Sequence, residues 1–115
     1  MPPPNEDNLG RRRFLLHREK AVEHALERIR HAVGSEWDTL SSEERAALKL
    51  CLAEIWMNTT YERWHQYCFS TLTGQDIREL VALSKDLETR HHLTDETFRS
   101  SEAILLQCSS NNPPH

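Results

Sequence analysis

Residues 46–57 read A-A-L-K-L-C-L-A-E-I-W-M, and this stretch decides the fold. Only Lys49 and Glu54 interrupt the apolar run, and at about 100° per residue they point roughly 140° apart on a helix. A helix without a wide polar face has to be covered from several sides. We therefore expect an all-α fold, a small bundle around a central buried helix, in which a second copy or a partner covers part of that helix.

Composition and charge narrow the class of protein. A chain of 115 residues with 28% charged residues and only 3 glycines suits one soluble helical domain. A net charge of −4 gives no general attraction to nucleic acid or to anionic lipid. The apolar run is too short to span a membrane. Cys51, Cys68 and Cys108 have no C-x-x-C spacing, and we expect reduced thiols in a cytoplasmic protein.

Local signals at helix ends divide the chain. Gly34 is typical of the residue that ends a helix, while Ser41 and Glu44 fit a capping box that opens one. Thr73 and Thr94 are expected N-caps of two further helices. These signals predict three long helices and one short one, at about 9–33, 42–70, 74–91 and 95–107. Residues 9–108 form the single domain in this interpretation, and 1–8 and 109–115 are expected to be disordered tails.

An aromatic face continues the central helix beyond its buried middle. Trp56, Thr60, Trp64 and Tyr67 follow one another at spacings of 4, 4 and 3 residues, and Tyr61 lies beside them. Aromatic side chains with polar groups are favoured at protein interfaces. We predict that these five residues form a dimer or partner interface. The alternative, that the neighbouring helices cover them as ordinary core, stays open.

Two polar patterns lie in the first expected helix. Arg11, Arg12, Arg13 and Arg18 place positive charge near the helix N-terminus, where it opposes the helix dipole. They are candidate contacts to an acidic partner or a phosphate, and a solvated first turn is the alternative. His17, His24 and His31 recur at heptad spacing, about 10 Å apart, which is too far for one shared metal ion. A pH-sensitive interface and a plain polar rim both remain open for them.

The sequence gives little support for a catalytic site or a metal site. Glu62–His65 and Glu88–His91 are both E-x-x-H pairs, as a di-iron bundle requires, but they lie about 12 and 21 Å from their shared turn. Metal–ligand bonds near 2 Å do not bridge such a difference. The sequence also lacks a Gly-rich phosphate loop and a nucleophile elbow. We expect no cofactor, no metal and no catalytic residue.

The third and fourth helices could form a helix-turn-helix, but the charge argues against it. The recognition helix would begin with Asp95 and Glu96, which repel phosphates, and His92 stands where the turn favours glycine. We therefore predict a non-enzymatic interaction or regulatory protein of the adaptor or inhibitor type. It is expected to be a homodimer that binds another protein, and neither membrane nor nucleic acid is an expected partner. A small DNA-binding transcriptional regulator and a metal-dependent, di-iron-like helical enzyme are the alternatives.

Overall fold

The computed structural model describes residues 5–107, and for residues 5–11, 86, 88 and 89 it describes the backbone alone. The described part is helical and contains no strand, which confirms the all-α bundle. The α-helices are α1 (Asn5–Val33), α2 (Ser42–Asn58), α3 (Tyr61–Gln66), α4 (Gly74–Leu83), α5 (Lys85–Arg90) and α6 (Asp95–Leu105). Two 3₁₀ turns, η1 (Gly34–Thr39) and η2 (Phe69–Thr71), lie between them.

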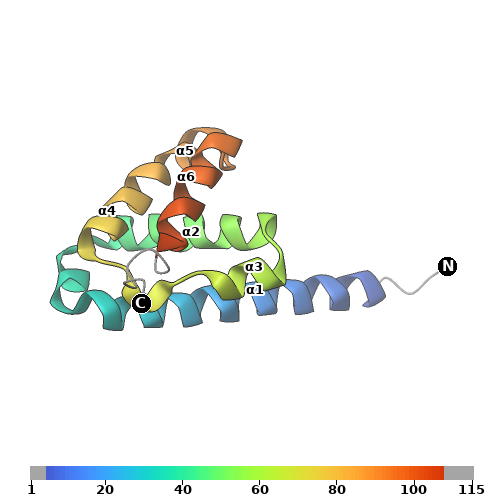
Figure 1. Cartoon of the computed structure of the whole chain (residues 1–115). Coiled ribbons are helices and arrows are strands. Elements are labelled where there is room, and N and C mark those ends of the chain that lie inside the picture. Colours follow the sequence, from blue (N-terminus) through green and yellow to red (C-terminus); the bar gives the residue numbers. More distant parts are fainter. Residues whose placement is uncertain (1–4, 108–115) are drawn as a thin grey trace, which may run out of the picture.

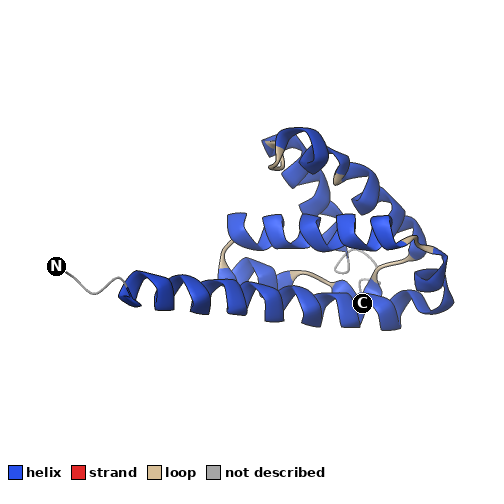
Figure 2. Ribbon diagram, turned by 180° about the vertical axis from the view of Figure 1, so that it is seen from behind, coloured by secondary structure: helices blue, strands red, loops and turns tan. Residues whose placement is uncertain are grey.

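The helices are arranged in two layers on either side of α2 (Figure 1). The long α1 forms the base, and α2 runs back along it. The chain then reverses again, so that α3 and η2 lie along α1 (Figure 2). On the opposite side, α4 and α5 pack on α2, and α6 returns against α4. This order confirms α2 as the centre of the fold.

The apolar run explains why α2 is central, although its burial is incomplete. Leu48, Leu52 and Ile55 are fully buried, and they hold the two layers together. Leu50 instead is 61% exposed, and Met57 at the end of the helix is 47% exposed. The chain therefore covers its central helix on most sides but leaves one apolar strip in contact with solvent.

The second helix is much shorter than predicted. It ends at Asn58 rather than near residue 70, because Thr59 and Thr60 adopt extended backbone angles. The Thr60 hydroxyl accepts a hydrogen bond from the Arg63 amide at 3.0 Å and so caps the new helix α3. Threonine competes for backbone hydrogen bonds in this way, which favours caps over helix interiors. The continuous helix predicted over 42–70 is therefore wrong.

The other expected starts and stops are close to those observed. The predicted capping box of Ser41 and Glu44 is formed, and Thr73 and Thr94 cap α4 and α6 through their hydroxyl groups. Thr73 also forms a capping box with Asp76. Each of these signals acts through a side chain three residues from its target. Local chemistry therefore sufficed to place them.

Three further helix boundaries agree with the prediction to different degrees. Gly34 has φ +61°, as expected of the residue that ends α1. The third expected helix is divided at the buried Ser84, whose hydroxyl donates to the Val81 carbonyl at 2.6 Å, into α4 and α5. Helix α1 begins at Asn5, four residues before the earliest expected start at Leu9. Residues 1–4 and 108–115 lie outside the described part, so the division into one domain and two tails stays a prediction.

Candidate functional site

The reversal of the chain at Thr59–Thr60 creates an open groove of about 730 Å³ between α1 and α3. We call it the α1–α3 groove. Its lining residues are Phe14, His17, Lys20, Ala21, His24, Ala25 and Arg28 from α1, with Trp56, Tyr61, Trp64, His65 and Phe69 from the opposite side. A volume of this size lies within the usual range of ligand sites, about 300–1,000 Å³.

The α1 wall of the groove is formed by side chains on one side of the helix, and the side chains in its middle are small. Phe14, Ala21, Ala25 and Arg28 recur at spacings of 7, 4 and 3 residues, which keeps them on one side of the helix. From Phe14 to Arg28 the stripe measures about 21 Å at 1.5 Å per residue. The two alanines carry only a methyl group each, and Ala25 is buried.

Aromatic rings form the opposite wall. Trp64 is buried and packs against Phe69, with ring centroids 5.1 Å apart. Trp56 contacts Phe14 across one end of the groove at 5.1 Å. Tyr61 is 77% exposed and forms the outer rim. The wall thus combines a buried apolar base with a polar, solvent-facing edge.

Arg28 closes the other end of the groove. Its guanidinium group lies 5.7 Å from the centre of the Phe69 ring, and its Nε donates to the Ser70 hydroxyl at 3.0 Å. These contacts fix the position of the Arg28 charge while leaving the residue exposed to solvent. The groove therefore has a cation anchored at the end opposite Phe14.

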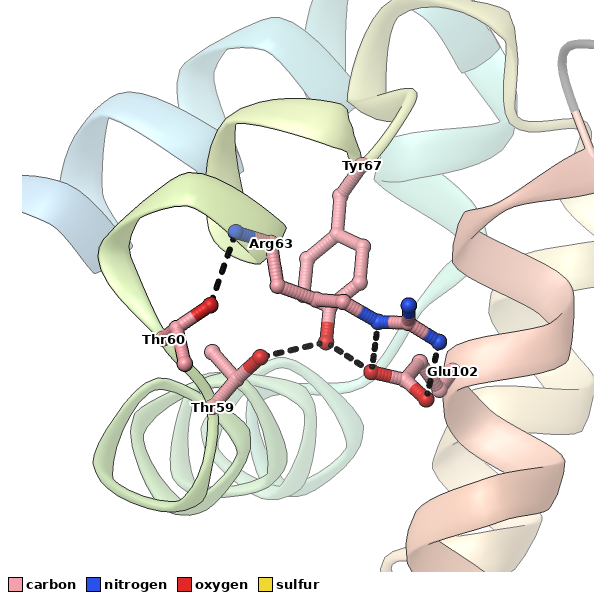
Figure 3. A network of polar contacts seen from close by, with 5 residues as sticks. All are labelled: Thr59, Thr60, Arg63, Tyr67 and Glu102. Atoms are coloured by element: carbon pink, nitrogen blue, oxygen red, sulfur yellow. Dashed lines mark hydrogen bonds and ion pairs between the residues drawn. The ribbon is translucent and has the colours of Figure 1, made fainter.

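A polar clamp holds α3 in place against α6 (Figure 3). Arg63 donates to both carboxylate oxygens of Glu102, Nε at 2.9 Å and Nη2 at 3.0 Å. The Tyr67 hydroxyl donates to the same carboxylate at 2.8 Å and shares a hydrogen bond with Thr59 at 3.2 Å. Paired charge-assisted bonds of this kind fix geometry well. The clamp therefore fixes the aromatic wall of the groove to a helix about 40 residues away in the sequence.

The clamp changes the protonation behaviour of its members. The hydrogen bonds from Arg63 lower the pKa of Glu102 below its ordinary value, so the carboxylate stays charged in neutral solution. Burial raises the pKa of Tyr67 to about 12, which keeps the phenol protonated as a donor. Arg63 is occupied by this carboxylate. The clamp is thus a structural element.

The predicted aromatic interface does not form one helix face. Because α2 ends at Asn58, Trp56 lies on a different helix from the other aromatic residues. Trp64 and Tyr67 are buried in the protein's own core, as the alternative interpretation had it. Trp56 is half-buried, and Thr60 and Tyr61 are exposed. An interface role for these residues stays a prediction.

The basic residues near the start of α1 remain accessible. Arg12 and Arg13 are exposed, and Arg18 is partly buried with its Nη1 3.3 Å from the sulfur of Met57. The Arg11 side chain lies outside the described part. Phe14 and Arg18 contact the last turn of α2, and the first turns of α1 project beyond that helix (Figure 1). Contact with an acidic partner or a phosphate stays a prediction for this cluster.

The histidines separate into two groups. His17 and His24 line the α1–α3 groove, whereas His31 lies beyond it and contacts Glu27 at 3.2 Å. His65 on α3 faces the groove from the other side, and its ring packs edge-on against Tyr61 at 4.3 Å. The heptad spacing did not reveal His65 as a member of this site, because it belongs to a different helix.

Sequence reasoning missed the groove itself. Ala21, Ala25 and Phe69 line it, yet none of them was a candidate site residue. The available signal was Thr59–Thr60, two consecutive threonines that can stop one helix and cap the next. The spacing of the aromatic residues continues past these threonines and favours an unbroken helix, so the break between α2 and α3 was not predicted.

Two further findings concern chemistry and membranes. Burial raises the pKa of the Cys51 thiol to about 12, so this free cysteine is no nucleophile in the folded protein. Cys68 is disulfide-bonded, so the expectation of reduced thiols is wrong for this residue. Among the side chains that the structure describes, which do not include those of residues 5–11, 86, 88 and 89, no three His, Cys, Asp or Glu groups lie close enough to hold a metal ion. The same part of the chain has no helix with the length and apolar character that crossing a membrane requires.

Comparison with known proteins gave no match to a family model, to a curated protein or to a solved structure. The geometry of the α1–α3 groove is therefore the basis for a functional proposal.

Proposed function

We propose that this protein is a non-enzymatic interaction module that holds a segment of another protein in the α1–α3 groove. The observation that supports it is the open groove of about 730 Å³ with apolar walls and a polar, exposed rim. Trp, Tyr and Arg are the residues that most often anchor protein partners, and Trp56, Tyr61 and Arg28 lie at its edges. The proposal includes a regulatory role of the adaptor or inhibitor type.

The proposal includes a homodimer. Phe14, Leu15 and Leu16 are consecutive, and each is between 39% and 53% exposed. Their side chains point about 100° apart around α1, and a second copy that packs on this turn would cover the exposed apolar area. Light scattering on the wild type at tens of micromolar should give twice the monomer mass, and Leu16→Glu should give the monomer. A wild type that stays monomeric at that concentration overturns the dimer.

Location in the cytoplasm is also part of the proposal, and only composition supports it. Charged residues of both signs make up 28% of the chain, as suits an aqueous compartment. The exposed Asp95 and Glu96 at the start of α6 favour a protein partner over DNA, since they would face phosphates. The partner is therefore sought among proteins.

Site-specific photocrosslinking tests the proposal. A benzophenone amino acid replaces Tyr61 at the groove rim, and in a matched variant it replaces the exposed Lys85 on α5. In the native cell, position 61 should give an adduct with a second protein that position 85 does not give. Equal adduct patterns at the two positions, or no protein adduct at position 61, would show that the groove is not the binding site.

A further inference from the structure

We propose that the occupant of the α1–α3 groove is an amphipathic helix that carries acidic side chains beside its apolar face. This inference rests on the proposed function and adds the chemistry of the partner. It follows from the shape of the groove and from the distribution of charge around it, which are independent observations.

The shape of the groove suits a helix. Its α1 wall extends for about 21 Å, the length of roughly 14 helical residues or four turns. The middle of this wall carries only the methyl groups of the partly exposed Ala21 and the buried Ala25, and the edges of the buried rings of Trp64 and Phe69 line the opposite side. Helix-in-groove recognition uses this combination, with apolar anchors at positions i, i+3 or i+4, and i+7.

The charged side chains that line the groove are all of one sign. Its ionisable lining residues other than Tyr61 are all basic or imidazole groups, and no carboxylate lines it. They are His17, Lys20, His24, Arg28 and His65. This is unexpected for a chain with 18 acidic residues and a net charge of −4. The groove therefore attracts a negatively charged partner even though the whole protein is acidic.

Two acidic residues of α1, Glu23 and Glu27, are engaged outside the groove. Glu23 pairs with Lys49 of α2 at 2.9 Å, and Glu27 lies near Arg30 and His31. Neither Lys20 nor Arg28 has a carboxylate within ion-pair distance among the described residues. Two cations beside an apolar groove are thus left for carboxylates that a partner supplies.

A peptide helix fits these observations better than a single-stranded nucleic acid. A nucleic acid would need a continuous row of cations along its phosphates, whereas the groove has only Lys20 and Arg28, eight residues apart on α1. The methyl groups of Ala21 and Ala25 in the middle of the wall favour aliphatic side chains over stacked bases. The nucleic acid is therefore included as a competing outcome.

Binding of synthetic peptides tests the inference. The probes are a labelled amphipathic peptide of about 14 residues with leucines on one face and glutamates beside them, and the same peptide with lysine for glutamate. Fluorescence anisotropy should show the acidic peptide binding at least about tenfold more tightly than the lysine peptide. A scrambled acidic peptide, which has no apolar face, should not bind measurably.

Matched charge reversals locate the site. Lys20→Glu should weaken binding of the acidic peptide by about tenfold, whereas Lys85→Glu, the same substitution on α5, should leave it unchanged. Circular dichroism confirms that both variants are folded. Equal affinity for the two peptides, an equal effect of the two substitutions, or tighter binding of a single-stranded oligonucleotide would each overturn the inference.

The photocrosslinking experiment and the peptide-binding experiment have distinguishable negative results. A protein adduct at position 61 without a preference for the acidic peptide would leave the proposed function in place and remove the acidic helix as its ligand. Preferential peptide binding that Lys20→Glu abolishes, without any adduct in the cell, would remove the proposed protein partner. It would also establish the chemical preference of the groove.

Discussion

The clamp around Glu102 offers the sharpest test of how the groove is maintained. Glu102→Ala removes the acceptor of both Arg63 and the buried Tyr67 hydroxyl. Arg63 is 46% exposed and returns to water, so the loss of its ion pair contributes little. Tyr67 loses a charged acceptor but keeps its hydrogen bond to Thr59, and the lost bond costs about 1.5–2 kcal/mol. We expect the free energy of unfolding to fall by about 1.5–2 kcal/mol.

Urea denaturation followed by circular dichroism measures this loss. Glu102→Gln is the informative comparison, because its amide oxygen still accepts from Tyr67 while the charge and one of the two acceptor oxygens for Arg63 are lost, so about 1 kcal/mol is expected. Glu62→Gln, at an exposed position on the same α3, is the control and should be neutral. A loss below about 0.5 kcal/mol for Glu102→Ala, or equal losses for both Glu102 variants, would refute this account of the clamp.

The pH dependence gives the same clamp a second readout. The pKa of Glu102 is lowered in the folded protein by the hydrogen bonds from Arg63, so the unfolded chain takes up a proton first as the pH falls. This stabilisation is present above the unfolded pKa near 4.5 and is lost as the pH falls through the folded pKa. Glu102→Gln should therefore reduce the acid-side slope of stability. An unchanged slope would mean that the carboxylate is not held in its charged form.

Three further predictions concern single residues. The pKa of Tyr67 is raised to about 12 by burial, so stability should fall as the pH rises from 10 towards 12, and Tyr67→Phe should remove this fall in alkaline unfolding measurements. The Cys51 thiol, with its pKa raised to about 12, should not react with iodoacetamide until the protein unfolds, as mass spectrometry of the alkylated peptide would show. Thr60→Ala removes the N-cap of α3 and should cost about 1 kcal/mol in urea denaturation, whereas Thr60→Ser should cost little.

The sequence by itself determined the features that depend on local chemistry. The caps at Ser41, Thr73 and Thr94 and the left-handed Gly34 each act within a few residues, so the spacing alone was enough to place them. The central position of α2 also followed from the sequence, because an apolar run without a polar face has to be covered by its neighbours.

Only the tertiary structure decided where α2 stops and what the aromatic residues do. The aromatic periodicity is equally compatible with an unbroken helix and with a break at Thr59–Thr60. The break prevails because reversal of the chain buries Trp64 and Tyr67 against distant parts of the chain and places Arg63 beside Glu102, 39 positions away. The groove opposite Ala21 and Ala25 is a consequence of that reversal. It depends on long-range contacts, which local spacing does not encode.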